Sequence, residues 1–521
     1  MKNKIISVFI PIISLIIIGV GCGNAENANG SNGNMGDTLN VAINENVSTL
    51  DPHMTTAAIT RDVSMNVYET LVTINSDVEP EPMLAESIEE SEDSKTYTFK
   101  LREGVKFHNG EEMTSDDVVA SMNRWKDQAD TAKSAFEDAE FIADDEYTVK
   151  LKLEEPRSDT LSLLSQQNQF PAIMPEEVID NASKEGVEEY VGTGPFEIDN
   201  WKRDQEIHLK RFEDYSPEDS DSNGLAGKKE ALVDDLYFQI VTDPSTQISG
   251  LESGEYDIAF GVPFDSYEQL ESAPNINVEN AFFGTMALDY NKKDGPFTDY
   301  KLREAVNVAL EADDIMFGAF SDDDLYKLES SYMPEGTWYS NAGEDTYNIG
   351  DKEEAKNLLE ESEYDGEELN LLTSRDIKYH YDIAVIIQQQ LKDIGMNVDV
   401  VEHDWATYLD KREEPSEWDL LTVGLSYNNS PSQLLVLGTN YVGWTSDNYI
   451  SDQMNSITTS ESEEEAKDKW DELQEYAWEE YLPVTQLGSV PIIVGMSDDV
   501  NGLKVENRPI MMPMWNVEIE E

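Results

Sequence analysis

Cysteine and histidine are both scarce in this sequence. The 521 residues include one cysteine, Cys22, and five histidines. A single thiol cannot form a disulfide within the chain, so the folded part must be stable without one. The histidines show no His-x-x-x-His or similar metal-binding spacing, and neither a Gly-x-Ser-x-Gly nucleophile motif nor a phosphate-binding P-loop occurs. We therefore expect no protein-built metal site, no cofactor and no catalytic residue.

Basic residues are few compared with acidic ones. The sequence has 36 Lys and Arg against 108 Asp and Glu, a formal net charge of −72. Phosphate backbones repel such a polyanion, which argues against nucleic acid as a partner. The acids are spread along the whole chain, which fits either binding of calcium or a cationic substrate, or a solvated acidic surface. No calcium loop with aspartate at all three positions, Asp-x-Asp-x-Asp-Gly, occurs, and diffuse charge acts on solubility, so we favour the acidic surface.

An acidic surface of this kind suits saline or alkaline surroundings, and we hypothesise a halophilic or alkaliphilic source. Added salt screens the repulsion between exposed charges. The melting temperature of the folded body is therefore expected to rise with NaCl concentration. Thermal melts in increasing NaCl test this expectation, and a melting temperature that falls with salt would contradict it.

Long apolar runs are absent apart from one at the start of the chain. Residues 5–20 are apolar except for two serines, and Lys2 and Lys4 precede them. The run is shorter than the roughly 20 residues of a membrane-spanning helix. Its charged start and small-residue end are typical of an export signal, so we predict a signal peptide over residues 1–21.

The signal ends in Gly19-Val20-Gly21-Cys22. This segment resembles the lipobox of bacterial lipoproteins, with Gly19 where the box usually has leucine. The resemblance implies cleavage before Cys22 and attachment of diacylglycerol to its thiol. The alternatives are a plain secretory signal with an incidental cysteine, or an uncleaved anchor. Residues 22–37 contain much Gly, Asn and Ser, which predicts a flexible tether.

Strand-like and helix-like patterns alternate along residues 38–521, which predicts an α/β protein of two or three domains. The expected strands begin near Thr38 and cover 96–101, 258–262 and 397–400. The expected helices cover 63–71, 301–309 and 383–394. Thr114 is expected to cap a further helix, with Asp117 at the third position of a capping box.

The segment from Leu84 to Trp125 carries the most specific pattern. It reads Leu84-Ala85-Glu86-Ser87, then Tyr97-Thr98-Phe99-Lys100-Leu101-Arg102-Glu103-Gly104-Val105-Lys106-Phe107-His108-Asn109-Gly110, then Met113-Thr114-Ser115-Asp116-Asp117-Val118. This pattern resembles the signature of family 5 extracellular solute-binding proteins, which bind oligopeptides, dipeptides, nickel chelates and some glycosides. Further segments match the family in order, including Leu50-Asp51-Pro52-His53, Gly192-Thr193-Gly194-Pro195-Phe196 and Trp418-Asp419-Leu420.

The resemblance implies a two-lobed, periplasmic-binding-protein-like α/β fold of type II, cluster C, whose lobes close over a ligand. The first lobe of this family carries an inserted subdomain. We map the first lobe to residues 38–77, 190–285 and 487–521, with the insert at 78–189. The second lobe is mapped to 286–486. Two crossover chains, near 283–290 and 480–490, would form the hinge.

The resemblance also implies where ligand residues lie. In peptide-binding relatives an aspartate of the second lobe commonly meets the ligand amine, in a loop that follows a strand and precedes a proline. Here the strand covers residues 420–425, and Tyr427 occupies the aspartate position. Asn428 and Asn429 follow, and they can donate neutral hydrogen bonds to a ligand or simply form a turn.

Three further places are candidates for ligand contact. Arg375 lies close to the position of a carboxylate-binding arginine in some dipeptide-binding relatives, although a surface salt bridge is an equal alternative. Relatives often touch the ligand backbone at the segment that corresponds to Asn46-Val47-Ser48. Trp405 and Trp444 are candidates for apolar walls, with a place in the core as the alternative.

These features together predict a lipid-anchored substrate-binding protein of an ABC importer. It would be a monomer on the outer face of the cytoplasmic membrane, or periplasmic if the source has an outer membrane. It would capture a peptide and pass it to the permease subunits without catalysis. Tyr427 in place of aspartate favours an alternative cargo on the same fold, namely a nickel chelate, a saccharide or a cationic osmolyte. A surface hydrolase and a receptor or signalling role are the other classes considered.

Overall fold

A large mixed β-sheet runs through the residues that the computed structural model describes, 38–460, 462–505 and 512–520. The predicted signal peptide, Cys22 and the tether lie outside these residues. The sheet has ten strands in the order β14-β13-β15-β12-β16-β11-β1-β10-β9-β8. Their bounds are β1 (Thr38–Ile43), β8 (Phe196–Lys202), β9 (Glu206–Arg211), β10 (Asp235–Ile240), β11 (Ile258–Phe260), β12 (Ile276–Tyr290), β13 (Glu368–Ser374), β14 (Asn397–His403), β15 (Leu420–Ser426) and β16 (Val484–Ser497).

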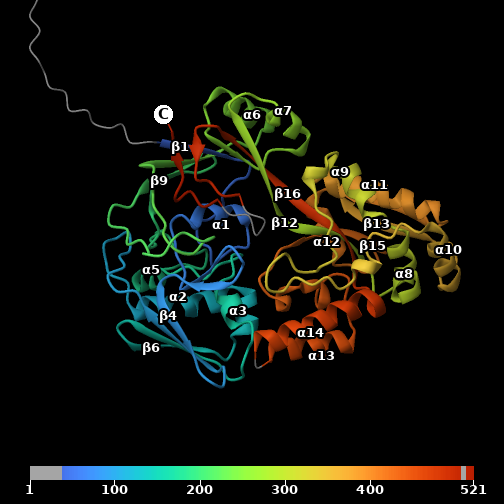
Figure 1. Ribbon diagram of the computed structural model, residues 1–521, viewed down its shortest axis with the longest axis horizontal. Helices are drawn as coiled ribbons and strands as arrows, with labels where there is room; N and C mark the ends of the chain where they lie inside the picture. The colour runs from blue at the N-terminus through green and yellow to red at the C-terminus, as the bar shows by residue number, and fades with distance from the viewer. Residues whose placement is uncertain (1–37, 461, 506–511, 521) are drawn as a thin grey trace, which may run out of the picture. The chain divides into compact units, whose positions relative to one another are not determined.

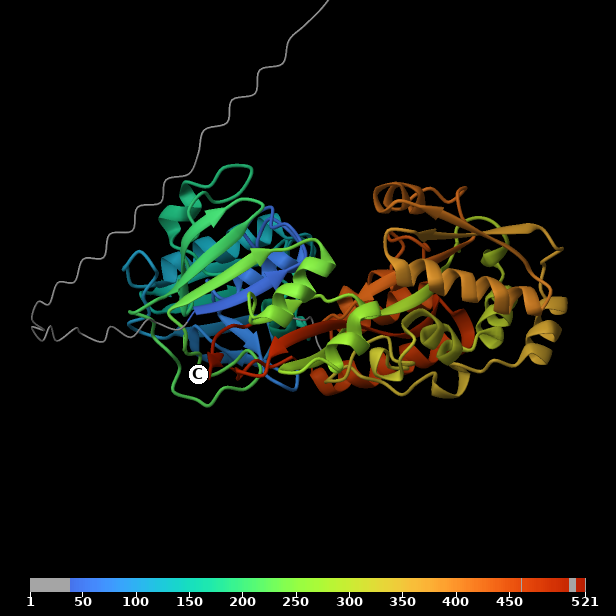
Figure 2. The ribbon, with the colours of Figure 1, turned by 90° about the horizontal axis from the view of Figure 1, so that it is seen from above.

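The two long central strands, β12 and β16, connect two groups of elements (Figures 1 and 2). They pair antiparallel, and a bulge at Phe283 interrupts the register. One half of β16 borders β11, and the opposite half of β12 borders β15. We call the part around β1 and β8–β11 the first lobe and the part around β13–β15 the second lobe. The segments 283–290 and 480–490, expected as crossovers, fall within β12 and around the start of β16.

The first lobe is built around β1, which pairs in parallel with β10 and β11. Its alternating residues Leu39, Val41 and Ile43 are fully buried, as the strand pattern from Thr38 predicts. The strand expected over 258–262 is present but shorter, since β11 ends at Phe260. Helices α1 (Ala58–Ser64) and α6 (Pro244–Ser253) also belong to this lobe.

The helix expected over residues 63–71 is wrong. Helix α1 spans Ala58–Ser64 and the chain then turns at Asn66. The Asn66 side-chain amide donates to the backbone carbonyls of Asp62 and Met512, each at 3.0 Å. The contact with Met512, near the end of the sequence, takes the place of further helical turns. A pattern of neighbouring residues cannot predict a contact over this separation.

The insert contains a four-stranded antiparallel sheet in the order β4-β5-β7-β6. Strand β5 spans Thr96–Leu101 and confirms the prediction for 96–101. Helix α2 (Ser115–Gln128) begins after Thr114, whose backbone N–H donates to the Asp117 carboxylate at 2.9 Å, so the predicted capping box is confirmed. The other elements here are β4 (Ala85–Glu90), β6 (Glu140–Asp145), β7 (Thr148–Lys152), α3 (Asp130–Ala135), α4 (Thr160–Leu164) and α5 (Glu176–Asp180).

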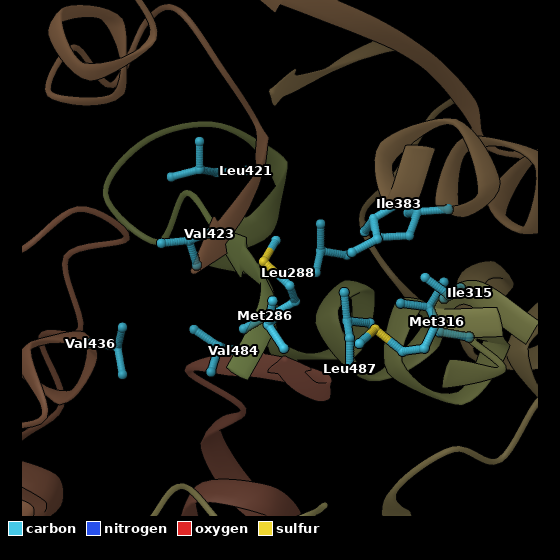
Figure 3. Packing of buried hydrophobic residues seen from close by; sticks show 14 of the residues in the cluster. Met286, Leu288, Ile315, Met316, Ile383, Leu421, Val423, Val436, Val484 and Leu487 are labelled. Carbon is cyan, nitrogen blue, oxygen red and sulfur yellow. The ribbon is translucent and has the colours of Figure 1, made fainter. Parts of the chain in front are cut away.

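The second lobe packs helices against β13, β14 and β15. Figure 3 shows its core, where Met286 and Leu288 of β12 lie with side chains from β15, β16 and the neighbouring helices. The helix and strand expected over 301–309 and 397–400 are confirmed, whereas the helix expected from residue 383 already begins at Lys378. The helices are α8 (Tyr300–Ala309), α9 (Ala312–Phe320), α10 (Lys352–Glu361), α11 (Lys378–Asp393), α12 (Trp405–Arg412), α13 (Asn448–Thr458) and α14 (Glu463–Tyr476).

A few short elements complete the described residues. They are β2 (Val72–Ile74), β3 (Pro80–Pro82), α7 (Tyr267–Glu271), β17 (Val500–Asn501) and β18 (Glu518–Ile519), together with 3-10 helices at Phe264–Ser266, Pro296–Thr298, Asp323–Leu325, Glu344–Thr346, Pro431–Gln433 and Leu435–Leu437 and a π-helix at Ala477–Tyr481. Among the helices in the described ranges, none has both the length and the apolar character to cross a membrane.

Candidate functional site

A cavity of about 520 Å³ is lined by residues of both lobes. This volume is in the range of small-ligand sites. Its lining includes Glu45, Arg61 and Asp62 of the first lobe, Gln166 and Asn168 of the insert, Phe283 and Ile492 of the central strands, and Asn428, Gln433, Leu434, Leu435, Val436 and Tyr441 of the second lobe. The central strands therefore form part of the wall between the lobes, and a ligand here would touch both.

Two of the three charged residues in the cavity lining belong to helix α1. Its neighbouring residues Arg61 and Asp62 are 7% and 3% exposed. Arg61 Nε donates to Asp62 Oδ1 at 2.7 Å, and Arg61 NH1 donates to Asn168 Oδ1 at 3.1 Å. Burial raises the pKa of Asp62 to about 6, the Arg61 charge opposes this rise, and the Glu45 charge adds to it. Glu45, Arg61 and Asp62 are the charged residues of the lining, and all three belong to the first lobe.

The second-lobe wall is neutral and largely apolar. Leu434, Leu435 and Val436 lie at a short 3-10 helix (Leu435–Leu437) in the segment after β15. Leu435 is 59% exposed although it is a large apolar side chain, whereas Leu434 and Val436 are buried. Phe283, at the bulge of β12, adds an aromatic ring at the junction of the lobes. Leu435 therefore offers apolar surface that a ligand in the cavity can contact. This wall fits an uncharged part of a ligand.

Hydrogen bonds join the insert to the second lobe beside the cavity. Asp159 Oδ2 accepts from Ser432 Oγ at 2.5 Å. Gln433 Nε2 donates to Gln166 Oε1 at 3.0 Å. One of these bonds joins two neutral amides, and the other has a carboxylate as acceptor. Both connect the insert to the second lobe, between residues more than 260 positions apart in the sequence. Such contacts stabilise the arrangement in which the lobes enclose the cavity.

Tyr427, at the position of the expected aspartate, does not line this cavity. It is buried, with its hydroxyl 2.6 Å from Ser489 Oγ and 3.3 Å from Glu329 Oε2. Ser489 Oγ in turn donates to the same carboxylate oxygen of Glu329 at 2.9 Å. Burial and the Glu329 charge raise the pKa of the Tyr427 hydroxyl, which stays protonated. Tyr427 therefore ties β15 to β16 instead of presenting a polar group to a ligand.

Asn428 is the predicted site residue that lies in the cavity wall. Its side-chain amide donates to the Ser426 carbonyl at 3.1 Å, so the turn role expected for asparagine is also present. Asn429 is buried instead, and its amide donates to the Ser165 carbonyl of the insert at 3.3 Å. The two asparagines thus have different places: one at the cavity and one at the contact between the insert and the second lobe.

The other predicted residues lie away from this cavity. Asn46 and Ser48 are exposed and Val47 is buried, directly after the cavity residue Glu45. Arg375 is exposed at the end of β13. Trp405 stacks on Tyr408 with ring centroids 5.1 Å apart, and Trp444 stacks on Trp418 at 5.6 Å. None of these predicted residues is in the lining described above, and their contact with a ligand stays a prediction.

Reasoning from the sequence missed all three charged residues of the lining, Glu45, Arg61 and Asp62. For the pair on α1 a local signal exists. The local signal is an adjacent Arg-Asp pair between the apolar residues Ile59 and Val63. Charged residues are rarely buried unless they are paired, so an Arg-Asp pair between apolar helix residues indicates a buried ion pair. The pattern does not reveal that α1 faces a cavity.

The described residues contain no group of three or more His, Cys, Asp or Glu side chains placed to hold a metal ion.

Comparisons with known proteins give the family. Residues 79–444 match the model of bacterial extracellular solute-binding proteins, family 5. A probable peptide ABC transporter periplasmic-binding protein of Sinorhizobium fredii is 28% identical, with 92% of this chain and 93% of that protein aligned. The dipeptide-binding protein DppE of Bacillus subtilis is also 28% identical, over 67% of each chain.

Solved structures agree on the fold. The periplasmic binding protein AgaA of A. tumefaciens, in complex with agropinic acid, superimposes with a TM-score of 0.75 at 26% identity, covering 93% of this chain and 99% of that one. DppA of Helicobacter pylori, in complex with the peptide STSA, gives 0.74 at 25% identity, covering 93% and 98%. Both are two-lobed binding proteins. The family match covers well over half of the chain, and the protein belongs to the bacterial extracellular solute-binding proteins of family 5.

Proposed function

We propose that this protein captures peptides outside the cytoplasm and delivers them to the permease of an ABC importer. The observation that carries the proposal is the cavity lined by both lobes and by the central strands. A ligand that touches both lobes stabilises their closed arrangement, because it binds that arrangement better than an open one. Binding and release of the ligand, without chemistry on it, are then sufficient for this protein's part in transport.

Peptide as the cargo is supported by the relatives and by the character of the cavity. The S. fredii and B. subtilis relatives are named for peptides or dipeptides, and the H. pylori structure holds a peptide. The cavity offers a charged end at α1, amides at Asn168, Gln433 and Asn428, and an apolar wall at Leu434. Peptides carry the matching charged ends, amides and side chains.

The experiment that tests the cargo uses the protein as it comes from its own cells. The folded body is purified without refolding, denatured, and the released small molecules are identified by mass spectrometry. We expect short peptides that are absent from a mock purification. A sugar or a metal complex in stoichiometric amount would contradict the peptide assignment and leave the family unchanged.

A non-peptide cargo is the second candidate, and one observation favours it. Tyr427 stands where an aspartate is expected, so the second lobe offers no carboxylate at that position. The Tyr427 hydroxyl is hydrogen-bonded to Ser489 and Glu329. Solved relatives hold agropinic acid and a nickel–histidine complex. The same mass spectrometry separates these cargoes from peptides.

We also propose that the protein is anchored through lipid on Cys22, with residues 22–37 as a tether to the folded body. The lobe boundaries given above and closure about the segments 283–290 and 480–490 belong to the same proposal. The run of strands from the first lobe through β12 and β16 to the second supports the lobe boundaries and the hinge segments.

Substitution of Cys22 by serine is expected to abolish labelling of the protein by palmitate in growing cells. Serine has no thiol to carry the diacylglycerol thioether, and the lone cysteine of the sequence leaves no other thiol to take its place. Metabolic labelling followed by immunoprecipitation measures the result. Equal label on the wild-type and C22S proteins would refute the anchor.

A further inference from the structure

The cavity is electrostatically one-sided. Its charged lining residues are Glu45, Arg61 and Asp62, all in the first lobe, and their formal charges sum to −1. The facing wall, Leu434 to Val436, carries no charge. A ligand therefore meets a negative end and an apolar end, and its own positive group is drawn to the first.

Arg61 is the less suitable partner for a ligand. Its Nε donates to Asp62 Oδ1 at 2.7 Å, and its NH1 donates to Asn168 Oδ1 at 3.1 Å. These bonds hold the guanidinium against its own helix and the insert. Asp62 is held in place by Arg61 at Oδ1, so its carboxylate is oriented before a ligand arrives. A buried, pre-oriented carboxylate is a strong acceptor for an ammonium group because water competes little there.

We propose that Asp62, supported by Glu45, is the counter-ion for the ligand's ammonium group, and that the ligand class is peptides with a free amino terminus and an apolar side chain. The amino terminus lies at α1, and the side chain lies against Leu434, Leu435 and Val436. The role of amine partner thereby belongs to the first lobe, since Tyr427 is committed to Ser489 and Glu329. The inference rests on the peptide function proposed above.

The ionisation of Asp62 supports this role. Its pKa is raised to about 6 by burial and by the Glu45 charge, against the opposing charge of Arg61. Burial therefore makes the charged form of the Asp62 carboxylate costly. An ammonium group placed beside it offsets that cost, so binding and ionisation favour each other.

The test compares three forms of one probe on the purified full folded body. The forms are trileucine, N-acetyl-trileucine and trileucine amide, and affinity is measured by isothermal titration calorimetry at pH 7.5. Trileucine and its amide keep the ammonium group, and N-acetylation removes it. We expect the acetylated form to bind roughly 10- to 100-fold more weakly, the range for a hydrogen bond between charged groups.

Variants assign the effect to its residue. Asp62→Asn keeps the shape and removes the charge, and it is expected to lose the preference for the free amino terminus. Glu45→Gln is expected to lose only part of it, because Glu45 is exposed. Asp127→Asn is the matched control: it removes an equal charge from an exposed position of α2 outside the cavity, and the preference should stay intact. Thermal melts of each unliganded variant show whether it folds.

A second readout is the pH dependence of trileucine-amide binding. The charged groups that face Asp62 are Arg61 and Glu45. Below pH 6 the empty site protonates at Asp62, so affinity at pH 5 is expected to be about 10-fold lower than at pH 7.5. The D62N variant should show no such loss.

The outcomes separate the two proposals. If trileucine binds equally well with and without the acetyl group, or if D62N keeps the discrimination, the role of Asp62 is overturned and peptide binding stands. If none of the three forms binds and extraction yields no peptide, the peptide function falls and takes this inference with it. Discrimination in the wild type and in D127N, lost in D62N, supports both.

Discussion

Substitution of Arg124 by methionine is expected to lower the free energy of unfolding by about 3–5 kcal/mol. Arg124 NH1 and NH2 donate to the two carboxylate oxygens of Asp51 at 3.0 and 2.5 Å. Asp51 is fully buried and also accepts from the backbone N–H of Val187 at 2.9 Å. Removal of the guanidinium would leave a buried carboxylate without its counter-ion, which is far more costly than loss of a surface pair.

The Asp51–Arg124 pair joins separate parts of the chain. Asp51 follows β1, whereas Arg124 belongs to α2 of the insert. Arg124 NH1 also lies 2.9 Å from His53 Nδ1, so this ring nitrogen is the acceptor. Burial raises the pKa of Asp51, and the hydrogen bond and charge of Arg124 outweigh that rise and hold it below its usual value. The pair thus fixes the insert against the first lobe.

Urea unfolding at pH 7 measures the effect. The control is Lys150→Met, which breaks an ion pair of 2.6 Å with Asp144 on the surface and should cost about 0–1 kcal/mol. The double variant Arg124→Met with Asp51→Asn removes both charges and is expected to recover part of the loss. A loss for R124M no larger than that for K150M would show that the buried pair does not stabilise the fold.

Local patterns predicted the regular elements well. The strand over 96–101 has the expected bounds, and the helix after Thr114 begins where its capping box indicates. Alternation and capping depend on neighbours within a few residues, which the sequence shows directly. The error at α1 has the opposite origin: Asn66 ends its turn with a bond to Met512.

The site was predicted less well, because it depends on which side chains distant segments bring together. The sequence predicts ligand contact for the loop after β15, and Asn428 of that loop lines the candidate cavity. The direction of Tyr427 is set by Ser489 and Glu329, which lie 62 and 98 positions away. The charged pair on α1 reaches the cavity only through the packing of the whole lobe.

Acidification is the second large effect expected for stability. Burial lowers the pKa of His53 to about 3, and that of His108 and His380 to about 4, from an ordinary value of 6.5. Below pH 6.5 the unfolded imidazoles take up protons that the folded ones do not. The contribution of these neutral rings to the free energy of unfolding is therefore fully present above pH 6.5. It is lost as pH falls toward the folded pKa, by about 1.4 kcal/mol per pH unit for each ring. Asp62 acts in the opposite direction between pH 3.8 and 6, because its folded pKa is raised.

His108 offers the cleanest test, because its two partners define the neutral ring. Its Nε2 lies 3.0 Å from the Gly194 carbonyl and donates to it, while Nδ1 accepts from the Gly192 N–H at 3.2 Å. A second ring proton would face another donor. His108→Gln can donate and accept but does not titrate, so we expect the slope of unfolding free energy against pH to fall by about 1.4 kcal/mol per unit between pH 6.5 and 4. Urea unfolding at half-unit steps measures the slope, and data at pH 8, where both states are neutral, correct for packing. An unchanged slope in the H108Q variant would mean that the ring already carries its proton in the folded protein, against the contact with Gly192.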